Sequence, residues 1–133
     1  MNEVANAIYD KLATNTSLVA QVGTRIYRGV APQSAIYPLV IITLMGGGVT
    51  TETPTDMADP FYLVSVISDV STAQAGTIAE YIKTALHRQT LTVSGWSNYW
   101  TGIGNHYEAV ELPSVTGKPL WQSGWFVRIN LSK

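Results

Sequence analysis

The sequence predicts one α+β domain, residues 1–133, in which a central, mostly antiparallel β-sheet is flanked by two main α-helices and carries a long protruding loop or hairpin. Three observations favour this fold. Two segments have apolar residues at helical spacing, several others are β-branched and apolar, and most of these strands follow one another without a helix between them. Consecutive strands favour antiparallel pairing, with the helices on one face.

The chain begins with a helical pattern. Residues 2–13 place Val4, Ile8 and Leu12 four apart on one stripe, which predicts an amphipathic helix. A second short helix is expected at 18–22, because Ser17 can cap it and Gly23 suits the left-handed conformation that ends a helix.

Extended segments follow at 25–30 and 39–45. The second is an unbroken apolar run and therefore predicts a strand buried on both faces. Three glycines interrupt it, and residues 50–60 are rich in Thr, Asp and Pro with few large apolar side chains. We expect residues 46–60 to project from the domain and to be ordered mainly by a neighbouring subunit or partner.

The second half combines one helix with several strands. A strand at 61–68 precedes a helix at 71–88, which Ser71 or Thr72 can cap. Further strands are expected at 91–93, 107–112 and 120–131, separated by a Gly/Ser/Asn-rich patch and a loop at 113–119, with the alternation of the last strand broken at Gly124. The predicted buried residues are Ile8, Leu12, Ile41, Val66, Ile78, Ile82 and Leu86.

Charged side chains are scarce. Eight basic and nine acidic residues make up 13% of the chain, against about 25% in ordinary soluble domains. Four Trp and seven Tyr accompany them, and interface cores are depleted in charge and enriched in aromatic residues. This composition favours an assembling subunit over a neutral monomer. The formal net charge of −1 gives no support for tight binding to nucleic acid.

No catalytic, metal or cofactor motif is present. Gly46-Gly47-Gly48 lacks the Lys and the helix of a phosphate loop, and His87 and His106 have no ligand spacing. Ser123 lacks the Gly-x-Ser-x-Gly elbow, and Asp56 and Asp59 have no framework to hold them as a pair. The absence of cysteine excludes disulfides and thiolate chemistry. We expect no enzyme and no cofactor. With no membrane-length apolar run and an N-terminus unlike a signal peptide, we also expect no membrane association.

Two groups of residues are candidates for contacts with a second subunit or partner. The first lies in the projecting segment and comprises Gly46, Gly47, Gly48, Thr50, Thr53, Asp56 and Met57. The second is Trp96, Tyr99 and Trp100, which stand in the Gly/Ser/Asn-rich patch. Trp121 and Trp125 share a strand face with Val127 and are assigned to the core. An alternative function is a monomeric carbohydrate- or partner-binding module that uses the three aromatic residues.

Several motifs resemble those of the tail-completion, or tail-terminator, proteins of long-tailed bacteriophages. The distinctive ones are R-I-Y-R-G-V-A-P-Q at 25–33 and Y-P-L-V-I-I at 37–42. Weaker similarity covers the turn at 18–23, the strand at 64–69, the helix at 73–86 and the segment 91–95. Residues 96–119 depart most from the family's pattern, so no contact residues are transferred there.

The resemblance implies a structural virion protein. Its relatives form a ring, hexameric in the tail terminators, that caps the tail tube and joins it to the head connector around the DNA passage. The implied partners are other copies of the chain, the major tail tube protein and the head connector or stopper protein. DNA would pass through without tight specific binding, as the low net charge also favours. The implied location is the head–tail interface of the virion, after synthesis in the bacterial host cytoplasm.

Overall fold

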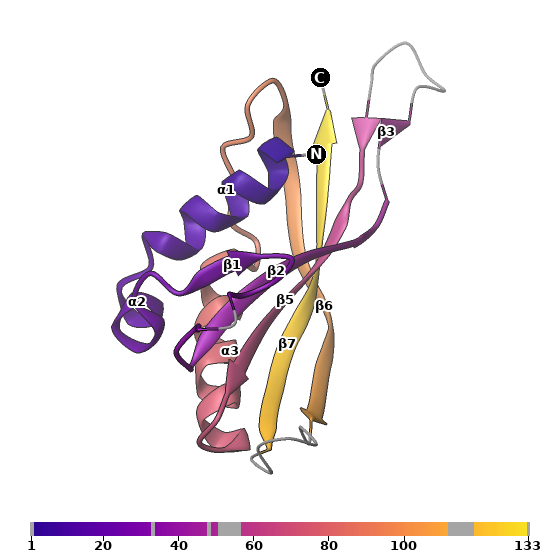
Figure 1. Ribbon diagram of the computed structural model, residues 1–133. Helices are drawn as coiled ribbons and strands as arrows, with labels where there is room; N and C mark the ends of the chain where they lie inside the picture. The colour runs from indigo at the N-terminus through magenta and orange to yellow at the C-terminus, as the bar shows by residue number, and fades with distance from the viewer. Residues whose placement is uncertain (1, 33, 48, 51–56, 112–118, 133) are drawn as a thin grey trace.

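The fold is known from a computed structural model (Figure 1), which describes residues 2–32, 34–47, 49–50, 57–111 and 119–132. The helices are α1 (Asn2–Ala13), α2 (Thr16–Val22) and α3 (Thr72–Leu86). The strands are β1 (Ile26–Arg28), β2 (Leu39–Gly46), β3 (Val49–Thr50), β4 (Met57–Ala58), β5 (Phe61–Ser68), β6 (Ser97–Glu111) and β7 (Leu120–Ser132).

The strands form one mixed sheet. Its order is β1-β2-β5-β7-β4-β3, and β6 pairs with the other side of β7. β1 is parallel to β2, whereas every other described pair is antiparallel. The predicted α+β fold with a mostly antiparallel sheet is therefore confirmed.

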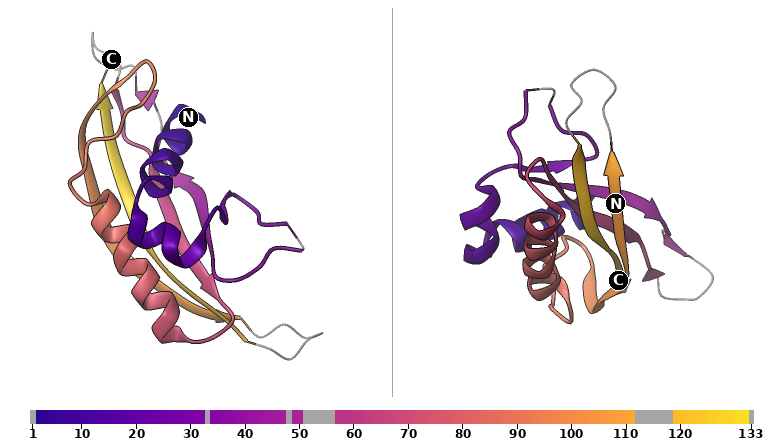
Figure 2. Two further views of the ribbon diagram at one scale, coloured as in Figure 1. Left: turned by 90° about the vertical axis from the view of Figure 1, so that its left-hand side faces the viewer. Right: turned by 90° about the horizontal axis from the view of Figure 1, so that it is seen from below.

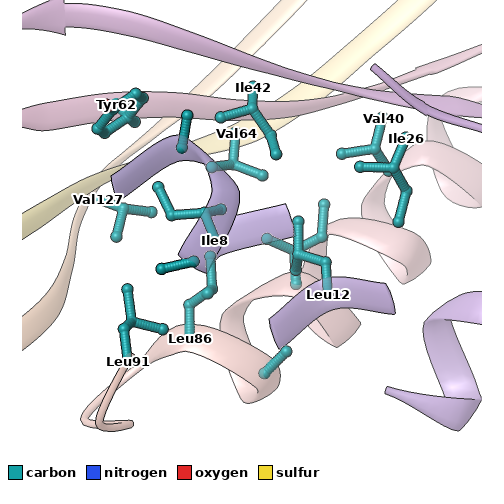
Figure 3. Packing of buried hydrophobic residues seen from close by; sticks show 14 of the residues in the cluster. Ile8, Leu12, Ile26, Val40, Ile42, Tyr62, Val64, Leu86, Leu91 and Val127 are labelled. Carbon is teal, nitrogen blue, oxygen red and sulfur yellow. The ribbon is translucent and has the colours of Figure 1, made fainter. Parts of the chain in front are cut away.

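All three helices cover the same face of the sheet (Figure 2). α3 packs against β5 and β7, while α1 and α2 pack against α3. In Figure 3, Ile8 and Leu12 of α1 lie between Leu86 of α3 and the strand residues, among them Val40 and Val64. Burying these aliphatic side chains contributes roughly 1.5–3 kcal/mol each relative to exposure.

The apolar patterns of the predicted helices and strands locate this core correctly with one exception. Six of the seven predicted core residues are buried: Ile8, Leu12, Val66, Ile78, Ile82 and Leu86. Ile41 is only partly buried, because it alternates with Val40 and Ile42 and so faces away from the helices. The predicted burial of the whole 39–45 strand is also wrong at its end, where Leu44 and Met45 are 48% and 47% exposed.

The helix ends differ slightly from expectation. Asn15, not Ser17, caps α2, since its side chain accepts a hydrogen bond from the Leu18 N–H at 2.9 Å. Gly23 ends α2 with a positive φ of 60°. Ser71 caps α3 by accepting from the Gln74 N–H at 3.1 Å, as predicted. The helix ends at Leu86 rather than Arg88, whose φ is 57°.

β6 is the largest departure from the sequence prediction. It is one strand of fifteen residues, and it includes the Gly/Ser/Asn-rich patch that was expected to be irregular. Pairing with β7 runs along its length, with register shifts between Asn98 and Trp100 and between Ile103 and His106. These shifts accommodate the intervening small and polar residues. Conversely, the strand expected at 91–93 is absent, although Leu91 and Val93 are buried.

Gly124 does not interrupt β7. The β5–β7 register is continuous from Trp121 to Arg128, with Gly124 opposite Ser65. A Cβ at Gly124 would lie 2.5 Å from the Val64 carbonyl oxygen and 2.7 Å from the Ser65 Cα. The glycine is therefore required by the close approach of β5 and not by a bulge.

Candidate assembly surfaces

The projecting segment is a hairpin that continues the sheet. β2 runs into β3, β4 runs into β5, and Val49 and Thr50 pair with Ala58 and Met57. β4 also pairs with the end of β7. The base of this hairpin is thus held within the sheet by backbone hydrogen bonds, which the sequence prediction of a hairpin allowed but did not specify.

Glycines shape the bend at the hairpin base. Gly47 has a φ of 77°, and a Cβ there would lie 2.4 Å from the Asp59 carbonyl oxygen. A Cβ at Gly46 would lie 2.7 Å from the Phe61 ring. These two glycines therefore allow the opposite strand to approach closely where the register shifts between Leu44 and Gly46.

The remaining candidates in the hairpin have different placements. Met57 lies in β4 and is 36% exposed. Thr50 lies in β3. Gly48, Thr53 and Asp56 lie outside the described residues. Leu44 and Met45, which the sequence analysis assigned to the core, are exposed beside the hairpin base.

The three aromatic candidates do not form one patch. Trp96 is partly buried and packs against the core, whereas Tyr99 and Trp100 are 57% and 42% exposed. The Trp100 indole lies against Gly102, where a Cβ would be 2.7 Å from its Nε1 atom. The Arg88 guanidinium lies 5.9 Å from the centre of the Trp100 ring, within cation–π range. Trp121 and Trp125 pack against the core, as predicted.

A cavity of about 500 Å³ opens beside Trp100 on the face of the sheet opposite the helices. Phe61, Phe126 and Arg128 contribute to its wall, and the Arg128 guanidinium lies 5.8 Å from the centre of the Phe61 ring. Strand alternation predicts that Phe126 and Arg128 share the face opposite Trp121 and Trp125, but no sequence pattern indicates that Phe61 lies beside them. Only the register, which sets Phe61 opposite Arg128 and Leu63 opposite Phe126, reveals their common face.

This helix-free face of the sheet combines apolar side chains with polar ones such as Ser65, Gln122 and Arg128. Its half-buried members include Ile41, Phe61, Leu63, Ile67 and Phe126. None of the described helices packs against it. A face of this kind is typical of surfaces that are covered on assembly.

His106 and Ser123 form a hydrogen bond that the sequence analysis did not predict. His106 lies in β6 rather than in a loop, and its Nε2 is 2.9 Å from the Ser123 Oγ. The centres of the His106 and Trp125 rings are 4.5 Å apart. The Lys83 Nζ atom lies 5.1 Å from the centre of the Trp125 ring.

The pair lacks the setting of a catalytic dyad. Ser123 is 1% exposed and pairs with β5 on one side and β6 on the other, so its backbone offers no free oxyanion donor. Among the described residues, no carboxylate hydrogen-bonds the His106 ring to orient it. The bond instead satisfies a buried hydroxyl.

Other chemical sites are equally unsupported within the described part of the chain. No group of three or more His, Asp or Glu residues there could hold a metal ion. Burial raises the pKa of Tyr62 above 10.0, with Arg28 acting in the opposite direction and Glu3 adding to the rise. This buried phenol belongs to the core. No helix in the described ranges is long and apolar enough to cross a membrane.

The described residues form a mixed sheet with helices on one face and several half-buried apolar side chains on the other. The family described as tail completion protein gp17 matches residues 6–105. The chain belongs to this family, and it is therefore a structural tail completion protein and not an enzyme. Its motifs at 25–33 and 37–42 lie within the matched range.

Comparison with solved structures supports the same fold. A chain from the virion of a native gene transfer agent particle superposes with a TM-score of 0.76 at 21% sequence identity, covering 96% of this chain and 93% of that chain. At this identity the similarity establishes the fold. No curated protein sequence matches the chain.

Proposed function

We propose that this protein is a virion component that forms a ring, caps the tail tube and joins it to the head connector around the DNA passage. The family match over residues 6–105 is the observation that carries this proposal. The similar chain in a gene transfer agent particle supports a location within a phage-like virion.

Surface chemistry also supports a subunit that is covered on assembly. Large apolar side chains are exposed around the molecule, while only 13% of the residues are charged. The exposed side chains are Tyr9, Val30, Ile36, Leu44, Met45, Met57, Val70, Tyr99, Trp100 and Val110. Covering such groups stabilises association through the hydrophobic effect.

The proposed partners are other copies of the chain, in a hexameric ring, together with the major tail tube protein and the head connector or stopper protein. The proposed contact positions are Gly46, Gly47, Gly48, Thr50, Thr53, Asp56, Met57, Trp96, Tyr99 and Trp100. The net charge of −1 favours a DNA passage without tight binding, because each neutralised phosphate would raise affinity and slow transfer.

A monomeric binding module is the competing function. The cavity beside Trp100 favours it, since aromatic rings with a cation could bind a planar or carbohydrate ligand. Light scattering separates the two functions. A ring gives a mass that is a fixed multiple of 14.4 kDa, whereas the module remains at that mass.

Complementation tests the joining function. Deleting the gene from the particle that encodes it should leave separate heads and tails in electron micrographs, and the wild-type gene should restore joined particles. Met57→Glu should fold but restore joining poorly, because an unpaired charge would be buried at a contact. Val70→Glu is the matched control, since Val70 is also exposed but lies outside both candidate groups. Joined, infectious particles from the deletion strain would contradict the proposal.

A further inference from the structure

Apart from the short β3 of the hairpin, the sheet has two edge strands, β1 beside β2 and β6 beside β7. We propose that β6 of one subunit pairs with β1 of the next copy, so that the sheet continues from subunit to subunit. This inference rests on the ring proposed above and specifies how its subunits meet.

The first half of the β6 edge is already occupied. The Arg88 N–H donates to the Thr101 carbonyl oxygen at 2.8 Å, and the Ile103 N–H donates to His87 Nδ1 at 3.2 Å. The connection after α3 therefore covers this part of the strand.

The second half, residues 104–110, is open. Among the described residues, no backbone hydrogen bond reaches its outer edge. Gly104, Asn105, His106, Glu108 and Val110 are exposed. The segment contains no Lys or Pro, which commonly protect edge strands, and beyond the register shift at 104–105 its pairing with β7 is regular from His106 onward. An open edge of this length is a template for another strand.

β1 offers a smaller complementary edge. Two backbone groups of β1 already form local hydrogen bonds. The Ile26 N–H donates to the Thr24 carbonyl oxygen, and the Arg28 carbonyl oxygen accepts from the Val30 N–H. The Arg25 carbonyl and Gly29 N–H are directed to β2, so by alternation the Ile26 carbonyl and Arg28 N–H point outward. An antiparallel neighbour could bond both.

The two edges lie in the same rows of the sheet. Register connects Tyr27, Ile41, Ser65, Gly124 and Tyr107 in one continuous row. The flanking rows likewise connect Ile26 with Glu108 and Arg28 with His106. A rotation that brings the β6 edge to the β1 edge of the next copy can therefore keep all three rows aligned.

The directions of β1 and β6 are also compatible with antiparallel pairing between two copies. β1 is parallel to β2, and three antiparallel steps lead from β2 through β5 and β7 to β6. β1 and β6 therefore run in opposite directions within one subunit. Rotation about an axis along the strands preserves this relation, so β6 would meet β1 of the next copy as an antiparallel pair.

The aligned rows set His106 opposite Arg28 of the next copy, and two other pairs of side chains are complementary. In the aligned pair, Tyr107 faces Tyr27 of the next copy, and Glu108 lies diagonally across from Arg28, which is exposed. Beside them, the exposed Val30 and Tyr9 line a cavity of about 600 Å³ at the β1 edge. Joining two different edges is a heterologous contact, which closes into a ring when the rotation permits.

Disulfide trapping tests this pairing, since the natural chain contains no cysteine. Facing residues of antiparallel strands are about 4.5–5.5 Å apart at Cα, within disulfide range. Oxidised Tyr27→Cys/Tyr107→Cys should give a ladder of covalent multimers up to the ring on non-reducing gels. Each single variant should stay monomeric there, as should Val70→Cys/Tyr107→Cys.

Light scattering on the same samples distinguishes failure of the strand pairing from failure of the ring itself. Rings without a covalent ladder would overturn the strand pairing alone. Dimers trapped by Tyr107→Cys by itself would also overturn it, because they would indicate a symmetric β6–β6 contact. A protein that is monomeric at every concentration would overturn both this pairing and the ring.

Charge exchange gives a second readout that needs no cysteine. Glu108→Arg should raise the protein concentration at which rings dissociate by several-fold, because it places like charges diagonally across the contact. Adding Arg28→Glu should restore much of the lost association. No change in either variant would contradict the proposed register.

Discussion

At the scale of single residues, Gly124 is the position where β7 leaves no room for a side chain. A Cβ at Gly124 would meet the backbone of β5 at 2.5–2.7 Å, which no side-chain rotation can relieve. Gly124→Ala should therefore cost about 1–3 kcal/mol or more of unfolding free energy. Urea denaturation measures this change.

A second glycine supplies the control for that substitution. A Cβ at Gly76 in α3 would meet nothing within 4 Å. Gly76→Ala should leave stability unchanged or raise it by up to about 1 kcal/mol, because Ala favours the helix. Equal stability of Gly124→Ala and wild type would contradict the close approach of β5 and β7.

Tyr62 makes stability depend on alkaline pH. Burial raises its pKa in the folded state above the reference value of 10.0. As pH rises past about 10, the unfolded chain loses this proton before the folded chain does, so the free energy of unfolding falls. Below pH 10 this contribution is fully present.

Tyr62→Phe should make the stability less sensitive to pH between about 9 and 11 than in the wild type. Urea titrations at a series of pH values measure the slope. Tyr99→Phe is the control, because Tyr99 is exposed. An identical alkaline slope in Tyr62→Phe and wild type would refute the role assigned to Tyr62.

At the scale of secondary-structure elements, local pattern predicts helices better than strands. The apolar stripes locate α1 to the residue and α3 to within two residues, since helical contacts are local. β6 could not be predicted in the same way. Its Gly and Asn residues favour a loop locally, but pairing with β7 and two register shifts hold them in a strand.

The candidate contact sites were likewise predictable only where local sequence pattern determines them. An apolar run such as 39–45 indicates a strand, but it does not tell which face the helices cover, and Ile41 was misplaced for that reason. The grouping of Trp100 with Phe61 and Phe126, and of His106 with Ser123, depends on interstrand register. Register is set by contacts distant in sequence, so composition alone gave no signal for either group.

The centre of the α3 stripe tests the packing of the helical layer. Ile82 is fully buried between α3 and the rest of the core. Ile82→Ala should lower the free energy of unfolding by about 2–5 kcal/mol through lost burial and the cavity left behind. The exposed neighbour Glu80 is the control, and Glu80→Ala should stay within about 0.5 kcal/mol of wild type. A small effect of Ile82→Ala would contradict the packing described.

At the scale of the whole molecule, the sheet has one face covered by its own helices and a second face, with half-buried Ile41, Leu63 and Phe126, that they leave uncovered. The small number of charged residues and the exposed apolar side chains are typical of a protein that functions by binding other subunits rather than by catalysis. The His106–Ser123 pair provides a direct check, because it is the arrangement closest to a catalytic one.

His106→Ala and Ser123→Ala should therefore preserve joined, infectious particles in complementation, with stability effects of about 1–3 kcal/mol from the lost hydrogen bond. Plaque counts and electron micrographs measure the outcome. Loss of infectivity by either variant, with rings and joined particles still normal, would indicate a reaction that the structural account does not include.

Cryo-electron microscopy of the particle that carries this protein tests the central claim most directly. We expect a closed ring of identical copies between the end of the tail tube and the head connector, surrounding the DNA passage, with each copy fitting the fold of this chain. Density for this chain elsewhere in the particle, or as an isolated copy without a ring, would contradict it.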